Sequence, residues 1–206
     1  RGLAGLFFAG YALSTGAAHA EAIHTPEDGL FTKNVLIPPA RPEGDYQIPG
    51  YIAMPDKPGK RPVILVVTEV FGVHEYIRDV CRRFAQQGYV ALTIDYFARK
   101  GNAAEAQDFD TVKALVEAAS YEQVMSDLQA SIDWLKSSPD IGQPRKTFGG
   151  KAFADMKHVG ITGFCWGGAT VWMAAATIPD IRAGVAWYGR LERPGPDQFM
   201  GAEDRP

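Results

Sequence analysis

The sequence has 206 residues, of which 46% are hydrophobic and 22% charged, and its formal net charge is −3. These values are typical of one globular domain with a buried core, and they exclude a disordered, collagen-like or coiled-coil chain. No run of Lys and Arg could follow a phosphate backbone, so we expect no nucleic-acid partner. The two cysteines form no CxxC motif and the four histidines have no metal-ligand spacing, so we expect no metal and no cofactor.

The first 20 residues are apolar and carry no acid. A small-x-small pattern ends at Ala20, which predicts a secretory signal peptide over residues 1–20 and an exported, periplasmic protein. A membrane anchor or a buried helix is the alternative, but residues 14–16 interrupt the apolar run, which is short for a membrane span. Residues 21–45 are rich in proline, charge and turn formers, and they predict a leader segment, either a linker or a meandering surface segment, before a domain over residues 46–206.

From residue 62 onward, apolar runs alternate with helical periodicity. Residues 62–69 are continuously apolar and β-branched, which is typical of a strand covered on both faces, and a helix with one apolar face follows and ends at Gly88. The further expected elements are a strand over 89–95, a helix from the capping-box pattern at 120–123 until Pro139, a strand over 158–162, a helix over about 166–176 and a strand over 181–187. This order predicts an α/β fold with a mostly parallel central sheet.

The run GFCWGG at residues 163–168 joins an expected strand directly to an expected helix. It has the form of a G-x-S-x-G nucleophile elbow with sulfur in place of oxygen. The sharp turn requires glycine two positions before and after the nucleophile, because side chains there would collide. Cys165 would then project beside a helix N-terminus, where N–H groups and the helix dipole favour a thiolate, and the N–H of Trp166 would form half of an oxyanion hole.

Other interpretations of this turn are weaker. A phosphate-binding loop fails on spacing, since Ala169 and Thr170 follow the glycine pair. A structural cysteine suits Cys81, which lies on an apolar helix face, better than Cys165. A disulfide between Cys81 and Cys165 is compatible with export, but nothing in the pattern supports it.

Three motifs in order along the chain resemble the dienelactone hydrolase (carboxymethylenebutenolidase) family of α/β-hydrolases, with similarity from about residue 47 to 191. They are TEVFG at 68–72, DYFAR at 95–99 and GFCWGG at 163–168. The resemblance implies an ester or lactone hydrolase with Cys165 as the nucleophile. It further implies that Glu69 activates the thiol, that Arg99 receives a substrate carboxylate, that the N–H of Val70 is the second oxyanion donor and that Tyr188 lines the pocket.

The residues themselves support part of this. Glu69 ends an apolar strand, where a charge is costly unless the strand end opens into a site, and ligands of α/β sheets bind at the carboxyl ends of strands. A solvated loop acid is the alternative for Glu69. Arg99 also follows a strand, and a guanidinium suits a carboxylate, but a surface arginine fits the pattern equally well.

The family's triad continues with an Asp and then a His, and we expect both beyond residue 206. His19, His24, His74 and His158 are not credible replacements, and Asp197 and Asp204 come too early in the chain. The Gly/Pro/Asp-rich end, from 193 onward, suggests that the domain is truncated, with strands and helices of the fold missing. The strand at 181–187 would then be an unprotected edge, and the isolated chain would be poorly soluble.

The expected activity is thus hydrolysis of a small-molecule ester or lactone through an acyl-enzyme. The substrate for which the family is named carries a carboxylate. Two alternatives stay open. One is a catalytically inactive α/β-hydrolase-like binding module, whose downstream sequence would lack the Asp and His. The other is a serine-hydrolase-like esterase in which cysteine is a drifted nucleophile.

Overall fold

A computed structural model describes residues 23–137 and 153–189, so the expected signal peptide and the C-terminal stretch lie outside the described residues. The strands are β1 (Leu30–Ile37), β2 (Ile48–Pro55), β3 (Arg61–Val67), β4 (Val90–Ile94), β5 (Ala154–Phe164) and β6 (Ile181–Trp187). The helices are α2 (Glu75–Gln86), α3 (Phe109–Ala118), α4 (Tyr121–Lys136), α5 (Trp166–Thr177) and the short 3₁₀-helix η1 (Ala103–Glu105).

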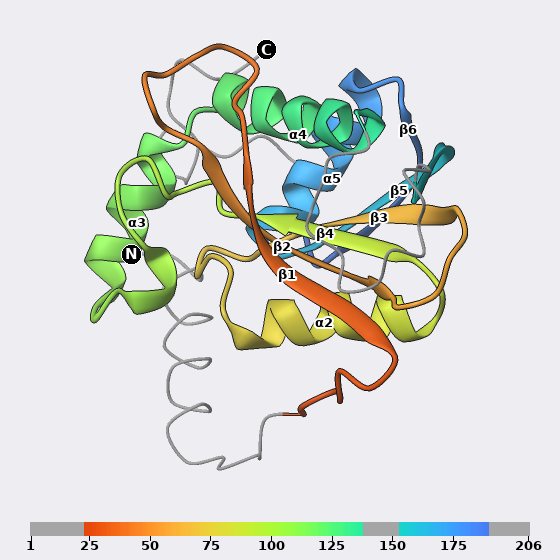
Figure 1. The fold of residues 1–206 in the computed structure, drawn as a ribbon. Coiled ribbons are helices and arrows are strands. Elements are labelled where there is room, and N and C mark those ends of the chain that lie inside the picture. The colour runs from red at the N-terminus through yellow and green to blue at the C-terminus, as the bar shows by residue number, and fades with distance from the viewer. Residues whose placement is uncertain (1–22, 138–152, 190–206) are drawn as a thin grey trace.

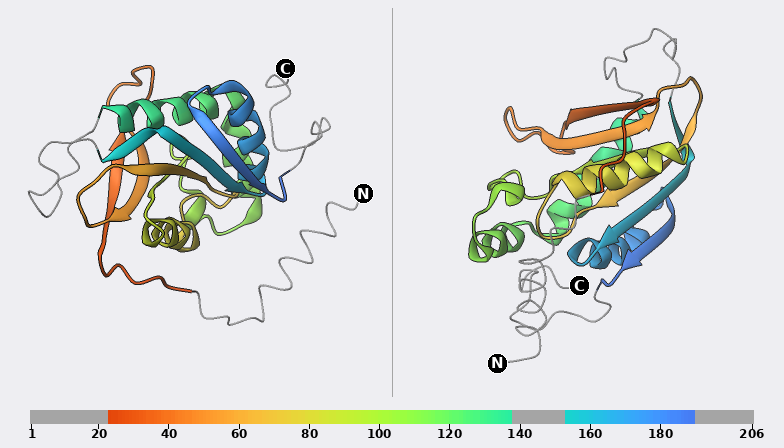
Figure 2. Two further views of the ribbon diagram at one scale, coloured as in Figure 1. Left: turned by 90° about the vertical axis from the view of Figure 1, so that its right-hand side faces the viewer. Right: turned by 90° about the horizontal axis from the view of Figure 1, so that it is seen from below.

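The six strands form one sheet in the order β1-β2-β4-β3-β5-β6. The β3, β4, β5 and β6 strands run parallel, and β1 and β2 are antiparallel to their neighbours. Helix α2 covers one face of the sheet, and α4 and α5 lie on the other (Figures 1 and 2). The expected α/β architecture with a mostly parallel sheet is therefore confirmed.

Each element predicted from the sequence between residues 62 and 187 is present, with small shifts at the ends. The β5 strand begins at Ala154, four residues before its expected start. Ser120 caps α4 as expected, since its side chain accepts the Gln123 N–H at 3.2 Å. The Gln123 side chain also donates through Nε2 to the Tyr96 carbonyl at 2.9 Å, which ties the first turn of α4 to the loop after β4.

Part of the chain expected as a meandering surface segment is a strand, so that prediction is wrong over residues 30–37. β1 pairs along its whole length with β2, and its side chains Phe31, Val35 and Ile37 are buried. The alternation of β1 is broken by polar residues at its centre, which hid the pattern. Helix α3 was likewise expected as part of a polar loop.

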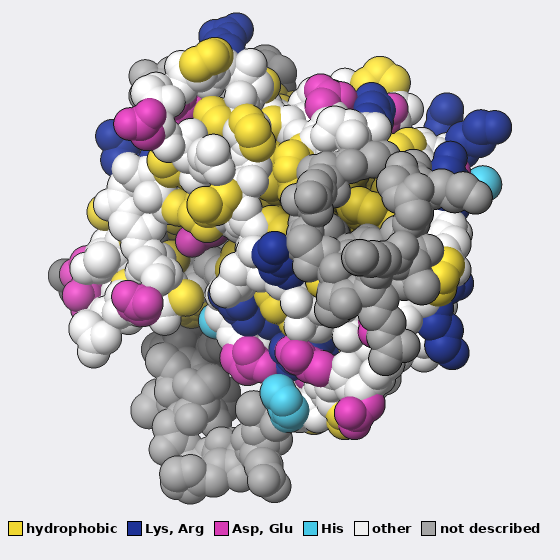
Figure 3. Space-filling view, viewed as in Figure 1, with side chains coloured by type: hydrophobic (Ala, Val, Ile, Leu, Met, Phe, Trp, Pro, Cys, Tyr) yellow, Lys and Arg dark blue, Asp and Glu magenta, His cyan; other side chains and the backbone are white. Residues whose placement is uncertain are grey.

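None of the helices in the described ranges has both the length and the apolar character needed to cross a membrane. On the face drawn in Figure 3, acidic and basic side chains are interspersed and do not form a large patch of one sign.

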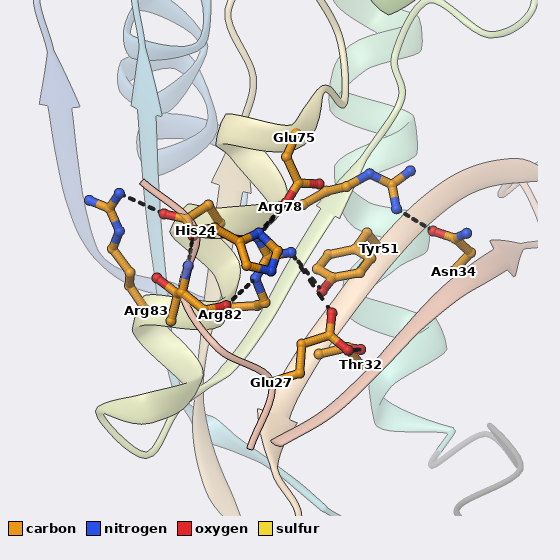
Figure 4. A network of polar contacts seen from close by, with 11 residues as sticks. His24, Glu27, Thr32, Asn34, Tyr51, Glu75, Arg78, Arg82 and Arg83 are labelled. Atoms are coloured by element: carbon orange, nitrogen blue, oxygen red, sulfur yellow. Dashed lines mark hydrogen bonds and ion pairs between the residues drawn. The ribbon is translucent and has the colours of Figure 1, made fainter. Parts of the chain in front are cut away.

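The segment before β1 is held against α2 by buried charges. The Thr25 N–H donates to Asp79 Oδ1 at 2.5 Å, and Arg82 Nε donates to the Thr25 carbonyl at 3.0 Å. Asp79 is fully buried and Arg82 is 2% exposed. The two side chains therefore satisfy the backbone N–H and carbonyl of Thr25, as the backbone of a neighbouring strand would. Arg82 also contacts Glu75 and Glu27, and His24 lies 3.3 Å from Glu75 (Figure 4).

We expect Asp79→Ala to lower the free energy of unfolding by about 3 kcal/mol, because it removes a buried partner of Arg82 and orphans the Thr25 N–H. Urea denaturation measures the change. The matched control is Asp133→Ala, which removes an exposed ion pair with Lys136 on α4 and should cost less than about 1 kcal/mol. Equal losses in the two variants would contradict the anchoring role of Asp79.

Candidate active site at the carboxyl edge of the sheet

The ends of three parallel strands bring the candidate residues to one edge of the sheet. Val67 of β3 pairs with Gly163 of β5, and Phe164 of β5 pairs with Trp187 of β6. Residues that follow these pairs therefore lie at the same level of the sheet. The register places Glu69, Cys165 and Tyr188 along this carboxyl edge.

Cys165 has the backbone conformation expected of a nucleophile elbow. Its φ is 55° and its ψ is −114°, and it is the residue immediately before α5. A non-glycine residue at such φ and ψ is strained, and strain of this kind occurs where a side chain must be held in one direction. The Cys165 N–H donates to the Trp187 carbonyl at 3.0 Å, which fixes the turn to the end of β6.

Close backbone packing explains the two glycines that flank the cysteine. A Cβ on Gly163 would lie 2.4 Å from the Gly167 carbonyl oxygen, and a Cβ on Gly167 would lie 2.4 Å from the Thr68 oxygen. The predicted collision two positions on either side of the nucleophile is therefore confirmed. The same contacts place the first turn of α5 against the end of β3, one residue before Glu69.

The Trp166 ring anchors the start of α5. It is 9% exposed and packs against the rings of Tyr96 and Phe97, with centroid separations of 5.5 and 5.1 Å. The second and third motifs of the sequence therefore meet in the core. Val70, which follows Glu69, is also buried.

Glu69 is paired with a histidine that begins the next helix. His74 Nε2 lies 3.1 Å from Glu69 Oε2, and the side chains of His74 and Glu69 are 28% and 15% exposed. His74 occupies the N-cap position of α2, where Ser, Thr, Asp or Asn is preferred, and its side chain makes no capping hydrogen bond. The imidazole instead holds the carboxylate and stacks against Tyr76.

Arg99 is held by two carboxylates. Its Nε and NH2 donate to Glu43 at 2.7 and 2.8 Å, and its NH1 and NH2 donate to Asp127 at 2.7 and 2.9 Å. The Tyr46 ring covers the guanidinium at 4.6 Å from the ring centroid. The Arg99 side chain is only 13% exposed, so the substrate role expected of it requires that one of these partners leave.

The environment of this cluster perturbs its acids in opposite directions. Burial raises the pKa of Asp127, although hydrogen bonds from Arg99 and Gln123 oppose that shift. The hydrogen bond from Arg99 lowers the pKa of Glu43, which lies nearer the surface. Burial also raises the pKa of Tyr46 to about 12.

Tyr188 belongs to a group of aromatic rings beside the elbow. Phe164, the residue before Cys165, stacks on Trp187 with a centroid separation of 6.2 Å and contacts Tyr188 at 6.5 Å. Trp187 and Tyr188 are 51% and 71% exposed. The edge of the sheet next to Cys165 is therefore apolar and aromatic.

Cys81 has the structural role expected of it. It is fully buried in the cluster between α2 and the sheet, burial raises the pKa of its thiol, and it forms no disulfide with Cys165. Within residues 23–137 and 153–189, no three His, Cys, Asp or Glu side chains are placed together to hold a metal ion.

Sequence reasoning overlooked Glu43, Asp127 and the pairing of His74 with Glu69. Asp127 carried a signal, since it lies on the apolar face of α4 with Val124 and Leu128, where a charge needs a buried partner. Glu43 carried none, because it lies in a loop and meets Arg99 only through the fold. His74 carried a signal, since it follows Glu69 by only five residues in the chain.

The comparisons with known proteins agree with this fold. The model of the "Dienelactone hydrolase family" matches residues 48–200. A protein of Methylorubrum extorquens described as "Putative carboxymethylenebutenolidase" is 43% identical over 184 residues, which cover 88% of this chain and 57% of that protein. A protein of Escherichia coli K12 with the same description is 36% identical over 184 residues, which cover 88% of this chain and 61% of that protein.

Among solved structures, one described as a "Putative Dienelactone Hydrolase" from Klebsiella pneumoniae has 35% sequence identity and a TM-score of 0.68. The match covers 83% of this chain and 65% of that one. The expected α/β-hydrolase fold is confirmed. The chain spans about three-fifths of the length of the two curated relatives.

We expect Gly163→Ala to lower the free energy of unfolding by about 3 kcal/mol or more, since the new Cβ meets backbone that cannot move without displacing α5. Gly160→Ala is the control on the same strand, because there the Cβ is tight only against the tip of the Ile64 side chain at 3.0 Å and lies no nearer than 3.7 Å to backbone. Urea denaturation of both variants decides the point. A Gly163→Ala variant as stable as Gly160→Ala would show that the elbow is not sterically fixed.

Proposed function

The chain belongs to the dienelactone hydrolase family, and from this premise we propose that it carries the nucleophile half of a hydrolase that cleaves an ester or lactone through Cys165. The observation that supports this most is the strained elbow, which holds Cys165 at the N-terminus of α5 beside the end of β3. A core cysteine such as Cys81 would need neither the strain nor the glycines.

The proposed reaction has two steps. The Cys165 thiol gives up its proton and attacks the carbonyl carbon, so the carbonyl oxygen becomes an oxyanion. The carbonyl then re-forms as the carbon–oxygen bond to the leaving group breaks, and the leaving oxygen takes the proton that the thiol gave up. Water then hydrolyses the thioester and restores the thiol. The N–H groups of Val70 and Trp166 are the proposed donors to the oxyanion, and a triad Asp and His are proposed to complete the site.

Glu69 is proposed to activate the thiol. It follows β3 by two residues, as Cys165 follows the Val67–Gly163 pair by two residues on β5, so the two side chains start from the same level of neighbouring strands. His74 would position the carboxylate by its hydrogen bond to Oε2. Tyr188 is proposed to line the substrate site. Binding of a substrate carboxylate by Arg99 stays a prediction, and it requires that the substrate displace Glu43 or Asp127 from the guanidinium.

An inactive binding module gains no support from the described residues, because it would not require a strained cysteine. Export to the periplasm is also proposed, on the composition of residues 1–20 alone.

We expect Cys165→Ala to lower hydrolysis of cis-dienelactone and of a 4-nitrophenyl ester on the order of 10³-fold or more, because the nucleophile is lost. The measurement uses the protein expressed from the complete reading frame, and Cys81→Ala is the matched control for loss of a thiol. If Cys165→Ser is as active as the wild type, the protein is a serine-type esterase with a drifted residue. Turnover that survives in Cys165→Ala would refute the proposed nucleophile.

We expect His74→Ala to lower kcat for the ester roughly tenfold while KM changes little, because a misplaced Glu69 activates the thiol less well. His74→Gln keeps an N–H donor and should recover most of the loss. His158→Gln, which removes an exposed histidine on β5 seven residues before Cys165, is the control. A KM effect without a kcat effect would assign His74 to substrate binding instead.

A further inference from the structure

Thr68, the residue before Glu69, has a fully buried hydroxyl to which the proposed reaction gives no role. We propose that this hydroxyl positions the oxyanion hole: it holds the Glu69–Val70 peptide group so that the Val70 N–H points at the reacting carbonyl oxygen. The inference rests on the proposed function, since it concerns the oxyanion that forms when Cys165 attacks.

The Thr68 hydroxyl binds the peptide group that carries the proposed donor. Thr68 Oγ1 donates to the Glu69 carbonyl oxygen at 2.8 Å. The Glu69 carbonyl and the Val70 N–H belong to one planar, trans peptide group, so they point in opposite directions within one plane. A hydrogen bond that holds the carbonyl in one direction therefore holds the N–H in the other.

This peptide group lies beyond the hydrogen-bond ladder of the sheet. The pairing of β3 with β5 ends at the Val67–Gly163 pair, and its pairing with β4 covers only Val63–Leu65. Interstrand hydrogen bonds set the peptide planes of β3 up to that point. After Val67 a different contact must set the plane of the Glu69–Val70 peptide, and the Thr68 hydroxyl supplies one.

Thr68 also contacts the nucleophile elbow. Its carbonyl oxygen lies so close to the first turn of α5 that a Cβ on Gly167 would be 2.4 Å from it. Gly167 directly follows Trp166, whose N–H is the other proposed donor. Thr68 therefore touches both halves of the proposed oxyanion hole, the α5 half through its carbonyl and the β3 half through its hydroxyl.

Other contacts hold the loop on both sides of the peptide group. The Val70 side chain is buried in the main core, and the Glu69 carboxylate is held by His74. The His74 N–H donates to the Gly72 carbonyl at 3.0 Å, which closes the end of the loop. A peptide plane can rotate while the side chains on either side of it stay in place, and this rotation is the motion that the Thr68 hydroxyl opposes.

The burial of Thr68 makes its hydrogen bond effective. Rotation of the peptide plane would leave a buried hydroxyl without its acceptor, which is costly. A carbonyl that accepts a hydrogen bond also polarises its peptide group, so the N–H of that group becomes a stronger donor. Both effects stabilise negative charge that develops in the transition state.

The test compares Thr68→Ser with Thr68→Ala, since both variants lack the methyl group and they differ only in the hydroxyl. With the protein from the complete reading frame, we expect kcat for a 4-nitrophenyl ester to be about tenfold lower in Thr68→Ala than in Thr68→Ser, with KM nearly equal, because the oxyanion forms only after the substrate binds. Removal of a whole oxyanion donor costs roughly 10²–10³ in kcat, and here the donor is misdirected, not removed. Equal kcat in the two variants overturns the inference.

Alkylation of Cys165 by iodoacetamide distinguishes the oxyanion hole from activation of the thiol. The thiolate attacks a saturated carbon and displaces iodide, so this reaction forms a carbon–sulfur bond without an oxyanion. We expect Thr68→Ser and Thr68→Ala to be alkylated at equal rates, as measured by mass spectrometry of the peptide that contains Cys165. An alkylation rate that falls in Thr68→Ala in proportion to kcat would assign Thr68 to activation of the thiol and overturn the inference.

The matched control is the same pair of substitutions at Thr93 on β4. Thr93 is also buried, and its hydroxyl has no hydrogen-bond partner among the residues that the structure describes. We expect Thr93→Ser and Thr93→Ala to have equal kcat. If kcat differs between them as much as between the Thr68 variants, loss of any buried hydroxyl has this effect and the inference is wrong.

Urea denaturation checks that each variant is folded under the assay conditions. If Thr68→Ala does not fold, Thr68→Val takes its place, because valine fills the volume of threonine without a hydroxyl. Its kcat is then compared with that of Thr68→Ser under the same expectation.

Cys165→Ala separates this inference from the proposed function. Turnover that is lost in Cys165→Ala but equal in Thr68→Ser and Thr68→Ala refutes the role of Thr68 and leaves the cysteine hydrolase standing. Turnover that Cys165→Ala does not change refutes the proposed function, and the inference about its oxyanion hole falls with it.

Discussion

The approach of the first turn of α5 to the end of β3 is the constraint on which the site depends. Backbone atoms of Gly167 and Thr68 are so close that no side chain fits between them. This contact forces the strained turn at Cys165 and sets the level of Glu69 relative to it. A helix that started one residue later would relieve the strain, but it would also move the thiol away from the edge where the other strands end.

Buried charged side chains are the second constraint. They lie where one segment of the chain must be held against another, and their role is to fix position more than to add stability. Ion pairs in a protein interior roughly offset their own desolvation, yet removal of one partner is costly. The Asp79–Arg82 pair fixes the segment before β1 to α2, and the Arg99–Asp127 pair fixes the loop after β4 to α4. Each pair thereby holds together segments that the sheet itself does not connect, the first through the Thr25 backbone and the second directly.

The sequence predicted what local patterns encode. The strands over 62–69 and 181–187, the helix after Cys165 and the glycine collision all follow from period and steric size, and they are present. β1 was not predicted, because polar residues occupy its centre and its pairing with β2 is a long-range property. The partners of Arg99 were not predicted either, because Glu43 and Asp127 are 56 and 28 residues away from it in the chain.

Helix α2 connects these two kinds of constraint. Its first residues follow the His74–Glu69 pair at the carboxyl edge, while Asp79 and Arg82, one and two turns further on, bind the backbone of Thr25. Because a helix is stiff over such a length, the position of the anchored segment and the position of His74 cannot vary independently. The weak N-cap at His74 is therefore tolerable: the tertiary contacts of α2, and not its own first turn, determine where the helix begins.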